Sequence, residues 1–322
     1  MKDFAGKIAV ITGGGCGMGR ELARQLVAEG CNVALCDVSA SAMAETRSLC
    51  EEAAPQGTRV TTHLADVSDE AQVLRFRDEA ARDQDTDRIH LLFNNAGIGG
   101  GGSLVAGPRE EWEKTFDVCW GGVYFCTRAF LPMLMAAAEG HIVNTSSVNG
   151  FWASLGPNIP HTAYSAAKFA VKGFTEALIT DLALNAPHIR CSVVMPGHIG
   201  TGIAANSRKV LAGTDSDILS AAELARARAR LAAMGMETGA LSDADIQAMV
   251  AEQARRFHDD APTAAAQAAT VILDGVRASD WRILVGDDAH HLDRAVRAAP
   301  EHAYEPEFFQ RLAKAVGWRV GT

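Results

Sequence analysis

The stretch Lys7-Ile-Ala-Val-Ile11, followed by Thr12-Gly-Gly-Gly-Cys-Gly-Met-Gly19, decides the fold of this chain. Its first five residues form an apolar run rich in branched side chains, which predicts a buried strand. The glycines that follow predict a tight turn. Residues Arg20–Glu29 carry apolar side chains on one face and stop at Gly30, which predicts a helix. The chain therefore begins with a strand, a glycine turn and a helix.

A second apolar strand, Cys31–Cys36, completes this unit and ends at Asp37. Strand, glycine turn, helix, strand and acid in this order are typical of a dinucleotide-binding unit. The glycines let the backbone approach a pyrophosphate, and the helix N-terminus offers amide donors and a positive dipole. Asp37 is then expected to accept hydrogen bonds from the adenosine ribose. The alternative is that Asp37 only begins the next loop.

Farther along, Tyr164-Ser-Ala-Ala-Lys168 places a phenol and an ammonium four positions apart. Residues at this spacing lie on one face of a helix. A free tyrosine has a pKa of about 10 and is a poor base at neutral pH, but a lysine cation held close lowers that pKa. The pair is therefore a candidate general acid/base, although a bare match of this kind also occurs on ordinary surface helices.

The chain resembles the short-chain dehydrogenase/reductase family in several motifs that follow the family's order. The glycine turn has the spacing Thr-Gly-x-x-x-Gly-x-Gly, and the Tyr164-x-x-x-Lys168 pair lies downstream. The other matching motifs are Asp66-Val67, Asn94-Asn95-Ala96-Gly97, Ile142-Val-Asn-Thr-Ser-Ser147 and Pro196-Gly197-His-Ile199-Gly-Thr201. The resemblance covers Ala5–Thr201 and continues from Pro262 to about Gly286.

The resemblance implies catalytic roles for Ser147, Tyr164 and Lys168. Ser147 would hydrogen-bond the substrate oxygen, because Ser146 would point to the opposite side of the strand. Lys168 would lower the pKa of Tyr164 and hold the nicotinamide ribose. The implied cofactor is NAD(H), and the residues implied to bind it are Thr12, Gly13, Cys16, Gly17, Met18, Gly19, Asp37, Asp66, Val67, Asn94, Ala96, Gly97, Tyr164, Lys168, Pro196, Gly197, Ile199 and Thr201.

One position departs from the family pattern. Where the family usually has an asparagine, this chain has Cys119. That asparagine contributes a backbone carbonyl to a proton relay, so the relay does not depend on the side chain. Because a thiol is a weak hydrogen-bond donor, we expect Cys119 to be a small buried packing residue.

The rest of the chain predicts a single α/β domain over residues 1–322. Strands are expected at Arg59–Leu64, Ile89–Phe93, His141–Thr145, Arg190–Val194 and Arg282–Val285. With the first two they form a doubly wound, Rossmann-like parallel sheet of about seven strands. Long helices are expected at Glu110–Ala138 and Ala163–Leu184. Related proteins dimerise through these two helices, which implies a homodimer or homotetramer.

Residues 202–261 are predicted to form a helical lid where the family has a shorter segment. One helix is expected over Leu219–Met234, and Ser242 can cap a second. In that second helix, Ile246, Met249, Val250, Gln253 and Phe257 share a face. Such a lid indicates a large apolar substrate, for example a steroid, terpenoid, aryl or alicyclic alcohol. The alternative is that these helices serve packing between chains or simple coverage.

Two further segments border the predicted site. The loop Val148–Ala163 is expected to form a wall of the substrate pocket, with apolar Phe151, Trp152 and Leu155 and with Asn149 and His161 as polar groups. The alternative for His161 is a histidine that faces solvent. A C-terminal extension, residues 289–322, carries Phe308, Phe309 and Trp318 and could reach the active site of a neighbouring subunit.

Composition indicates a soluble cytoplasmic enzyme. The net charge of −9 argues against nucleic-acid binding, and seven irregularly spaced cysteines indicate reduced thiols. We find no metal-ligand spacing, no secretory signal and no apolar run long enough for a membrane. The sequence thus predicts an NAD-dependent oxidoreductase that interconverts a secondary alcohol and a ketone. The alternative is a catalytically weak NAD(H)-binding regulatory protein, suggested by Cys119.

Overall fold

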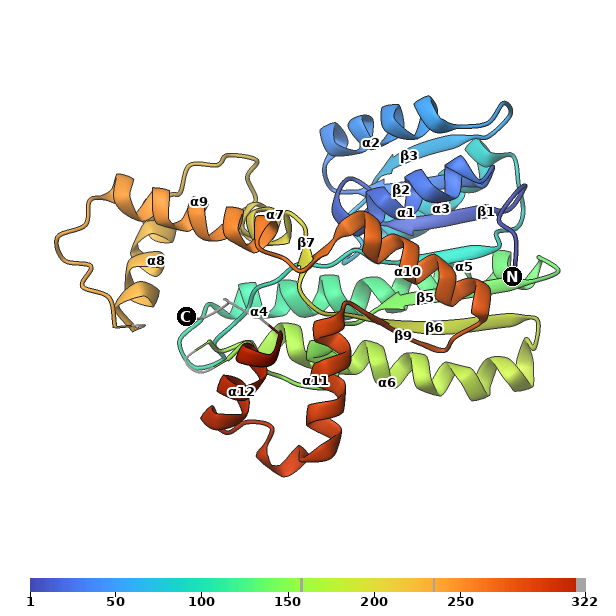
Figure 1. The fold of residues 1–322 in the computed structure, drawn as a ribbon. Coiled ribbons are helices and arrows are strands. Elements are labelled where there is room, and N and C mark those ends of the chain that lie inside the picture. Colours follow the sequence, from blue (N-terminus) through green and yellow to red (C-terminus); the bar gives the residue numbers. More distant parts are fainter. Residues whose placement is uncertain (157–158, 234, 317–322) are drawn as a thin grey trace.

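A seven-stranded parallel sheet in the order β3-β2-β1-β4-β5-β6-β9 forms the centre of the molecule (Figure 1). The computed structural model describes residues 1–156, 159–233 and 235–316. Its strands are β1 (Ile8–Thr12), β2 (Asn32–Asp37), β3 (Val60–Leu64), β4 (Leu91–Asn94), β5 (Gly140–Thr145), β6 (Ile189–Pro196) and β9 (Arg282–Val285). A second, two-stranded sheet pairs β7 (Ile199–Gly200) with β8 (Thr263–Ala264). The large sheet confirms the predicted doubly wound fold in a single domain.

Helices cover both faces of this sheet. They are α1 (Gly17–Ala28), α2 (Ala40–Ala53), α3 (Glu70–Gln84), α4 (Arg109–Phe116), α5 (Gly122–Met135), α6 (Thr162–Asn185), α7 (Ile203–Ala212), α8 (Ala221–Ala233), α9 (Asp243–Asp259), α10 (Ala265–Ala278), α11 (Asp287–Ala298) and α12 (Pro306–Val316). A π-helical turn, Asp117–Gly121, joins α4 to α5, and short 3-10 turns lie at Val148–Gly150 and Pro300–His302.

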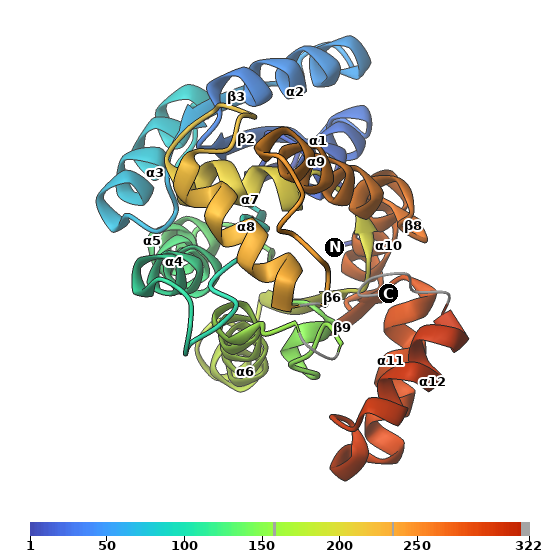
Figure 2. The ribbon, with the colours of Figure 1, turned by 90° about the vertical axis from the view of Figure 1, so that its left-hand side faces the viewer.

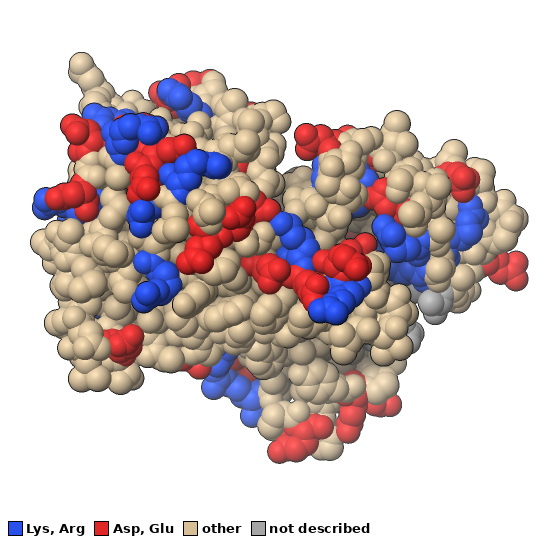
Figure 3. Space-filling model, turned by 180° about the vertical axis from the view of Figure 1, so that it is seen from behind, with Lys and Arg blue, Asp and Glu red and all other residues tan. Residues whose placement is uncertain are grey.

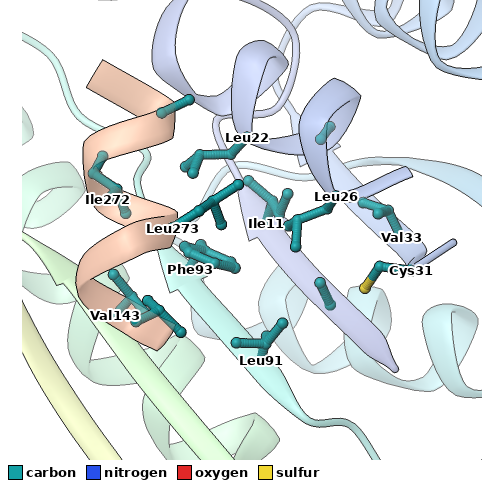
Figure 4. Packing of buried hydrophobic residues seen from close by; sticks show 14 of the residues in the cluster. Ile11, Leu22, Leu26, Cys31, Val33, Leu91, Phe93, Val143, Ile272 and Leu273 are labelled. Carbon is teal, nitrogen blue, oxygen red and sulfur yellow. The ribbon is translucent and has the colours of Figure 1, made fainter. Parts of the chain in front are cut away.

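The alternation of side chains along each strand builds a core on each side of the sheet. Ile11 packs in a cluster with residues of α1 and α10, among them Leu22 and Ile272 (Figure 4). Its neighbour Val10 belongs to the opposite cluster, where α3, α5 and α6 pack. Because both faces are buried, the strands read as nearly continuous apolar runs, which is why the sequence predicted them well.

The predicted elements and the observed ones differ mainly at their ends. Every predicted strand is present, and Arg282–Val285 has the predicted bounds. The helix predicted over Glu110–Ala138 is divided by the π turn, and α7, β7 and β8 were not predicted. The helix predicted to end at Met234 is α8, but Met234 lies outside the described residues.

Contrary to the sequence-based expectation, one helical stretch is long and apolar enough to cross a membrane. Residues Arg109–Met135 pass this test by length and composition. In the structure, 56% of the most apolar window of this stretch is buried inside the protein. The stretch lies beside β4 and α6, and its second half, α5, contributes Phe130 and Cys126 to the hydrophobic core. It is therefore placed as a core helix.

Charged residues of both signs are mixed on the surface shown in Figure 3. Lysine and arginine side chains lie among aspartate and glutamate side chains there, without one large basic patch. Many form short-range pairs, such as Arg47 with Glu51 and Arg255 with Glu252.

Candidate active site

The glycine turn lies at the carboxyl end of β1, between this strand and α1. Gly13 and Gly17 have positive φ angles of 65° and 55°, which favour glycine. A Cβ atom on Gly19 would fall 2.1 Å from the carbonyl oxygen of Gly13, so no side chain fits there. Helix α1 begins after Cys16 without a side-chain cap or an acidic residue in its first turn. Its first amides are therefore suited to an anionic group such as a pyrophosphate.

Two side chains fasten this turn to the neighbouring strand. The hydroxyl oxygen of Thr12 accepts hydrogen bonds from the amides of Asn95 and Ala96, both at 3.0 Å. The side-chain amide of Asn95 donates to the carbonyls of Thr12 and Gly13. The sequence had assigned Asn94 to the cofactor and had not assigned Asn95.

The side chain of Asn94 has its partners within the protein. Its side chain is buried and donates to Asn144 Oδ1 at 2.8 Å and to Thr127 Oγ1 at 3.0 Å. It therefore ties β4 to β5 and α5, and the assignment of Asn94 to the cofactor stays a prediction. Strand alternation directs Asn94 and Asn95 to different surroundings.

Asp37 lies at the end of β2, beside the glycine turn. Its carboxylate accepts hydrogen bonds from the amides of Gly15, at 2.9 Å, and Ser39, at 3.0 Å. Arg20 of α1 lies near this position and donates to the Gly15 carbonyl. The guanidinium of Arg20 is also paired with both carboxylate oxygens of Glu45, at 3.0 and 2.7 Å. The cation near the turn is thus already neutralised by its own carboxylate partner.

Asp66 and Val67 follow β3 and make contacts within the protein. Asp66 accepts hydrogen bonds from Ser68 and from the ammonium of Lys114, the latter at 2.5 Å. Burial acts to raise the pKa of Asp66, but the hydrogen bonds from Lys114 and Ser68 outweigh it and lower the pKa. Val67 packs closely on Gly122: a Cβ atom added to Gly122 would lie 2.6 Å from a methyl group of Val67. Both side chains therefore fix the path of the chain at the edge of the site.

Ser147, Tyr164 and Lys168 are brought together by β5 and α6. The Ser147 hydroxyl is hydrogen-bonded to the Tyr164 phenol. Ser146, in contrast, donates its hydroxyl to the Lys168 carbonyl at 2.7 Å and faces the other way. The Lys168 ammonium donates to the Thr145 carbonyl at 2.8 Å and lies 5.4 Å from the centre of the Tyr164 ring. This geometry agrees with the assignment of the second serine to the site.

The pKa of Tyr164 differs from the sequence-based expectation. Burial raises it above its ordinary value, and the hydrogen bond from Ser147 opposes this only in part. Lys168 does not offset the effect, because burial also lowers the pKa of its own ammonium and its proton is bound to a backbone carbonyl. At neutral pH the phenol therefore carries its proton and is poised to donate it.

Cys119 lies in the π-helical turn and is fully buried. Its thiol donates to the Ile98 carbonyl at 3.2 Å. A Cβ on Gly97 would lie 3.5 Å from the Lys168 ammonium and 3.7 Å from the Cys119 sulfur. Cys119 is thus the predicted small buried residue, and in addition it holds the segment that runs past Lys168. Single π turns recur at functional sites, where they shift the backbone bonding pattern.

The segment Pro196–Thr201 connects β6 to β7 and passes beside the glycine turn. The methyl group of Thr201 would be 3.1 Å from a Cβ on Gly17, and Ile199 is buried in the core. Asp288, at the start of α11, accepts a hydrogen bond from the His198 amide at 2.7 Å. A Cβ on Gly197 would fall 2.2 Å from the same carboxylate. Asp288 therefore shapes this segment, although nothing in the local sequence marked it.

In the loop after Ser147, the side chain of Trp152 has a different environment from the one predicted. Trp152 is buried, donates its indole N–H to the Ala303 carbonyl at 2.7 Å, and packs against Phe308 and Phe309. The side chain of Trp152 therefore anchors the loop to the C-terminal extension and does not line a pocket. The C-terminal extension packs on its own chain through these contacts; Trp318, also assigned to it, lies outside the described residues.

His161 lies against the ring of Tyr164. The two ring centres are 4.7 Å apart and the planes are tilted by 31°. Burial lowers the pKa of His161 to about 4, so the imidazole is neutral at physiological pH. The structure thus favours the reading of His161 as a polar group at the site over the reading as a histidine that faces solvent.

Helices α7, α8 and α9 lie in front of the carboxyl edge of the sheet (Figure 2). The Ser207 hydroxyl of α7 accepts a hydrogen bond from the Gly99 amide at 2.8 Å. Arg226 of α8 lies 3.6 Å from Glu111 of α4. Ser242 caps α9 as predicted, and Ile246 is fully buried, whereas Gln253 of the predicted apolar face is exposed. These helices therefore border the edge where the glycine turn and Tyr164 lie.

Comparisons with known proteins agree with this geometry. The sequence matches the family described as short chain dehydrogenase over residues 7–212. It is 39% identical over 207 residues to SadH of Mycobacterium tuberculosis, named as an oxidoreductase, covering 64% of this chain and 72% of that one. It is 35% identical to levodione reductase of Leifsonia aquatica, covering 65% and 75%. A short-chain dehydrogenase/reductase from Burkholderia phymatum, solved in complex with NAD, has a TM-score of 0.75 and 30% identity, covering 95% and 98%.

Proposed function

The chain belongs to the short-chain dehydrogenase family, and on that premise we propose that it interconverts a secondary alcohol and a ketone with NAD(H). The observation that carries this proposal is the contact of Ser147 with Tyr164, beside the buried ammonium of Lys168. Two hydroxyl groups meet there at the carboxyl edge of the sheet, which is where open α/β sheets bind their ligands.

The glycine turn fits a dinucleotide, because its positive φ angles and the uncapped start of α1 leave backbone amides for a pyrophosphate. Gly13, Gly17 and Gly19 would border that group, and Asp37 would face the adenosine ribose. Pro196–Thr201 would border the nicotinamide end. When bound, NAD(H) supplies the acceptor or donor of the hydride.

The residues of this chain would then handle the oxygen and the proton. Ser147 and Tyr164 each offer a hydroxyl to the reacting oxygen. Because burial raises the pKa of Tyr164, its phenol holds a proton that it can donate when a ketone is reduced. The side-chain nitrogen of Lys168 lies beside the phenol ring, 5.4 Å from its centre. In the direction of alcohol oxidation, the same phenol must first lose its proton.

We further propose that the substrate is bulky and largely apolar, such as a steroid, terpenoid, aryl or alicyclic compound. Helices α7–α9 border the carboxyl edge of the sheet, and α7 is hydrogen-bonded to the Gly99 amide. The relative named levodione reductase supports a ketone as the oxidised substrate. The preference for NAD(H) over NADP(H) rests on Asp37 and is supported by the NAD-bound relative.

A homodimer or homotetramer is part of the same proposal. Helices α5 and α6 expose Tyr124, Met135, Phe169, Ile179 and Leu184. Apolar side chains on two adjacent long helices are suited to pairing with a second copy. A cytoplasmic location is supported by the seven cysteines, all of which are free thiols.

A turnover panel tests the proposed activity. NADH oxidation would be followed with cyclic, aryl and steroidal ketones, and NAD reduction with the matching alcohols. We expect turnover with at least one bulky pair. Tight NADH binding without turnover on the whole panel would refute the enzymatic proposal and favour a regulatory NAD(H)-binding protein.

A further inference from the structure

Most polar side chains around Tyr164 already have partners in the protein. Ser146 donates to the Lys168 carbonyl, and the side-chain amide of Asn149 donates to the carbonyls of Trp152 and Ser154. His161 differs from them: within the described part of the chain its imidazole has no hydrogen-bond partner, although its ring lies against Tyr164. Among the described residues of this loop, its imidazole is therefore available to a ligand.

The surroundings of His161 are mostly apolar. It lines an open pocket of about 440 Å³ together with Ala153, Ile159 and Pro160, next to the catalytic groups but without Ser147 or Tyr164 in its lining. Ser165, which lines the same pocket, is 3% exposed, and its buried hydroxyl also has no partner among the described residues. Few protein groups nearby can therefore satisfy the imidazole.

A neutral imidazole has one N–H donor and one nitrogen acceptor. Burial keeps His161 in this form, since it lowers the pKa to about 4. His161 is only half-buried, so a substrate that covers its imidazole would displace water from it. A polar group that loses water without gaining a partner costs free energy, and a substrate made only of hydrocarbon around its reacting carbon would carry that cost. A substrate with an oxygen at this position would remove it.

We propose that His161 hydrogen-bonds a second oxygen of the substrate, so that the substrate is a hydroxyketone, a diketone or the corresponding diol. This inference rests on the alcohol–ketone activity proposed above. Because the ring centres of His161 and Tyr164 are 4.7 Å apart, the second oxygen lies close to the reacting carbon, most simply on the adjacent carbon.

The test compares two substrates of equal size. For the ring ketone that the unmodified protein reduces best, kcat and KM are measured with its 2-hydroxy and its 2-methyl derivatives. A hydroxyl and a methyl group fill similar volumes, but only the hydroxyl can pair with the imidazole. We expect kcat/KM to favour the 2-hydroxy ketone by at least about fivefold, the lower range for a buried polar group that gains a partner.

Variants assign the effect to the imidazole. His161→Phe keeps a ring against Tyr164 but removes both nitrogens, so we expect the ratio of kcat/KM for the 2-hydroxy ketone to that for the 2-methyl ketone to fall to about one. His161→Asn keeps a donor and an acceptor and should retain part of the preference. His291→Phe, an exposed histidine on α11, serves as the matched control and should keep it fully.

Three outcomes would overturn the inference. The first is an equal kcat/KM of the unmodified protein for the 2-hydroxy and the 2-methyl ketone. This measurement does not depend on the folding of any variant. The second is an equal loss on both derivatives in His161→Phe, which would mean that the ring only positions Tyr164. The third is an unchanged preference in that variant. Absence of turnover with every ketone would instead refute the proposed function itself, together with this role.

Discussion

Replacement of Asp37 tests how the site distinguishes NAD(H) from NADP(H). Its carboxylate holds the Gly15 and Ser39 amides at 2.9 and 3.0 Å, so it stands directly beside the glycine turn. NADP(H) carries an additional phosphate on the adenosine ribose, and two anions would meet at this place. The cation nearest to the turn, Arg20, is already paired with Glu45 through two hydrogen bonds. We therefore expect the unmodified protein to prefer NAD(H).

The magnitude follows from the hydrogen bond that the ribose would make. A charge-assisted hydrogen bond contributes about 1.5–3 kcal/mol, which is about tenfold to a hundredfold in binding. We expect a preference for NAD(H) of at least about tenfold. Asp37→Ala should narrow it, because NADH loses an acceptor and NADPH loses a repulsive charge. Asp37→Asn keeps an acceptor for the Gly15 amide and isolates the effect of the charge.

The assay is a fluorescence titration of NADH and NADPH without substrate, followed by kcat/KM with both cofactors. The quantity to compare between variants is the ratio of the NADH and NADPH dissociation constants, because loss of the contact between Asp37 and the Gly15 amide weakens the binding of both cofactors. Glu45→Gln frees Arg20 and should strengthen NADPH binding by up to about fivefold, with Glu51→Gln on the exposed side of α2 as its control. Equal affinities or a preference for NADPH in the unmodified protein would refute the role of Asp37, as would an unchanged ratio in Asp37→Ala.

Four further perturbations have defined outcomes. Tyr164→Phe should lower kcat by about a hundredfold or more while NADH binding is largely kept, and near-normal turnover would exclude this residue as the proton donor. Cys119→Ser should keep most of the activity, because a hydroxyl can also donate to the Ile98 carbonyl; a loss as large as that of Tyr164→Phe, with an intact circular dichroism spectrum, would show that the thiol itself matters. Shortening Leu219–Phe257 should raise KM more for bulky ketones than for small ones, and equal effects would indicate a role in assembly or stability. Because burial raises the pKa of Tyr164, alcohol oxidation should speed up as pH rises above neutral while ketone reduction declines only at alkaline pH; initial rates across pH that show the opposite slopes would contradict a protonated resting phenol.

The sequence by itself determined the features that depend on neighbours along the chain. The strands are buried on both faces, so their apolar runs marked them, and the glycine turn followed from its spacing. The Tyr164–Lys168 pair depends only on the helical repeat, and the alternation of a strand separated Ser147 from Ser146. Each of these is set within a few residues, and therefore it can be read from local sequence.

The tertiary structure decided which side chains are free to serve the site. The side-chain amide of Asn94, a residue that the sequence assigns to the cofactor, is bound by Asn144 and Thr127, which are distant in sequence. Trp152 was taken for a pocket wall, but Phe308 and Phe309 bury it.

The sequence analysis did not identify Asp288 or Arg20, because their contacts are with residues elsewhere in the chain. Asp288 acts on His198, which is far from it in the chain, and Arg20 matters through Glu45 and the Gly15 carbonyl. Burial of Tyr164 and Lys168 likewise reversed the pKa shift that their spacing alone predicted for the phenol. Hydrogen-bond partners and desolvation are properties of the packed interior, where segments remote in sequence meet, so no local pattern specifies them.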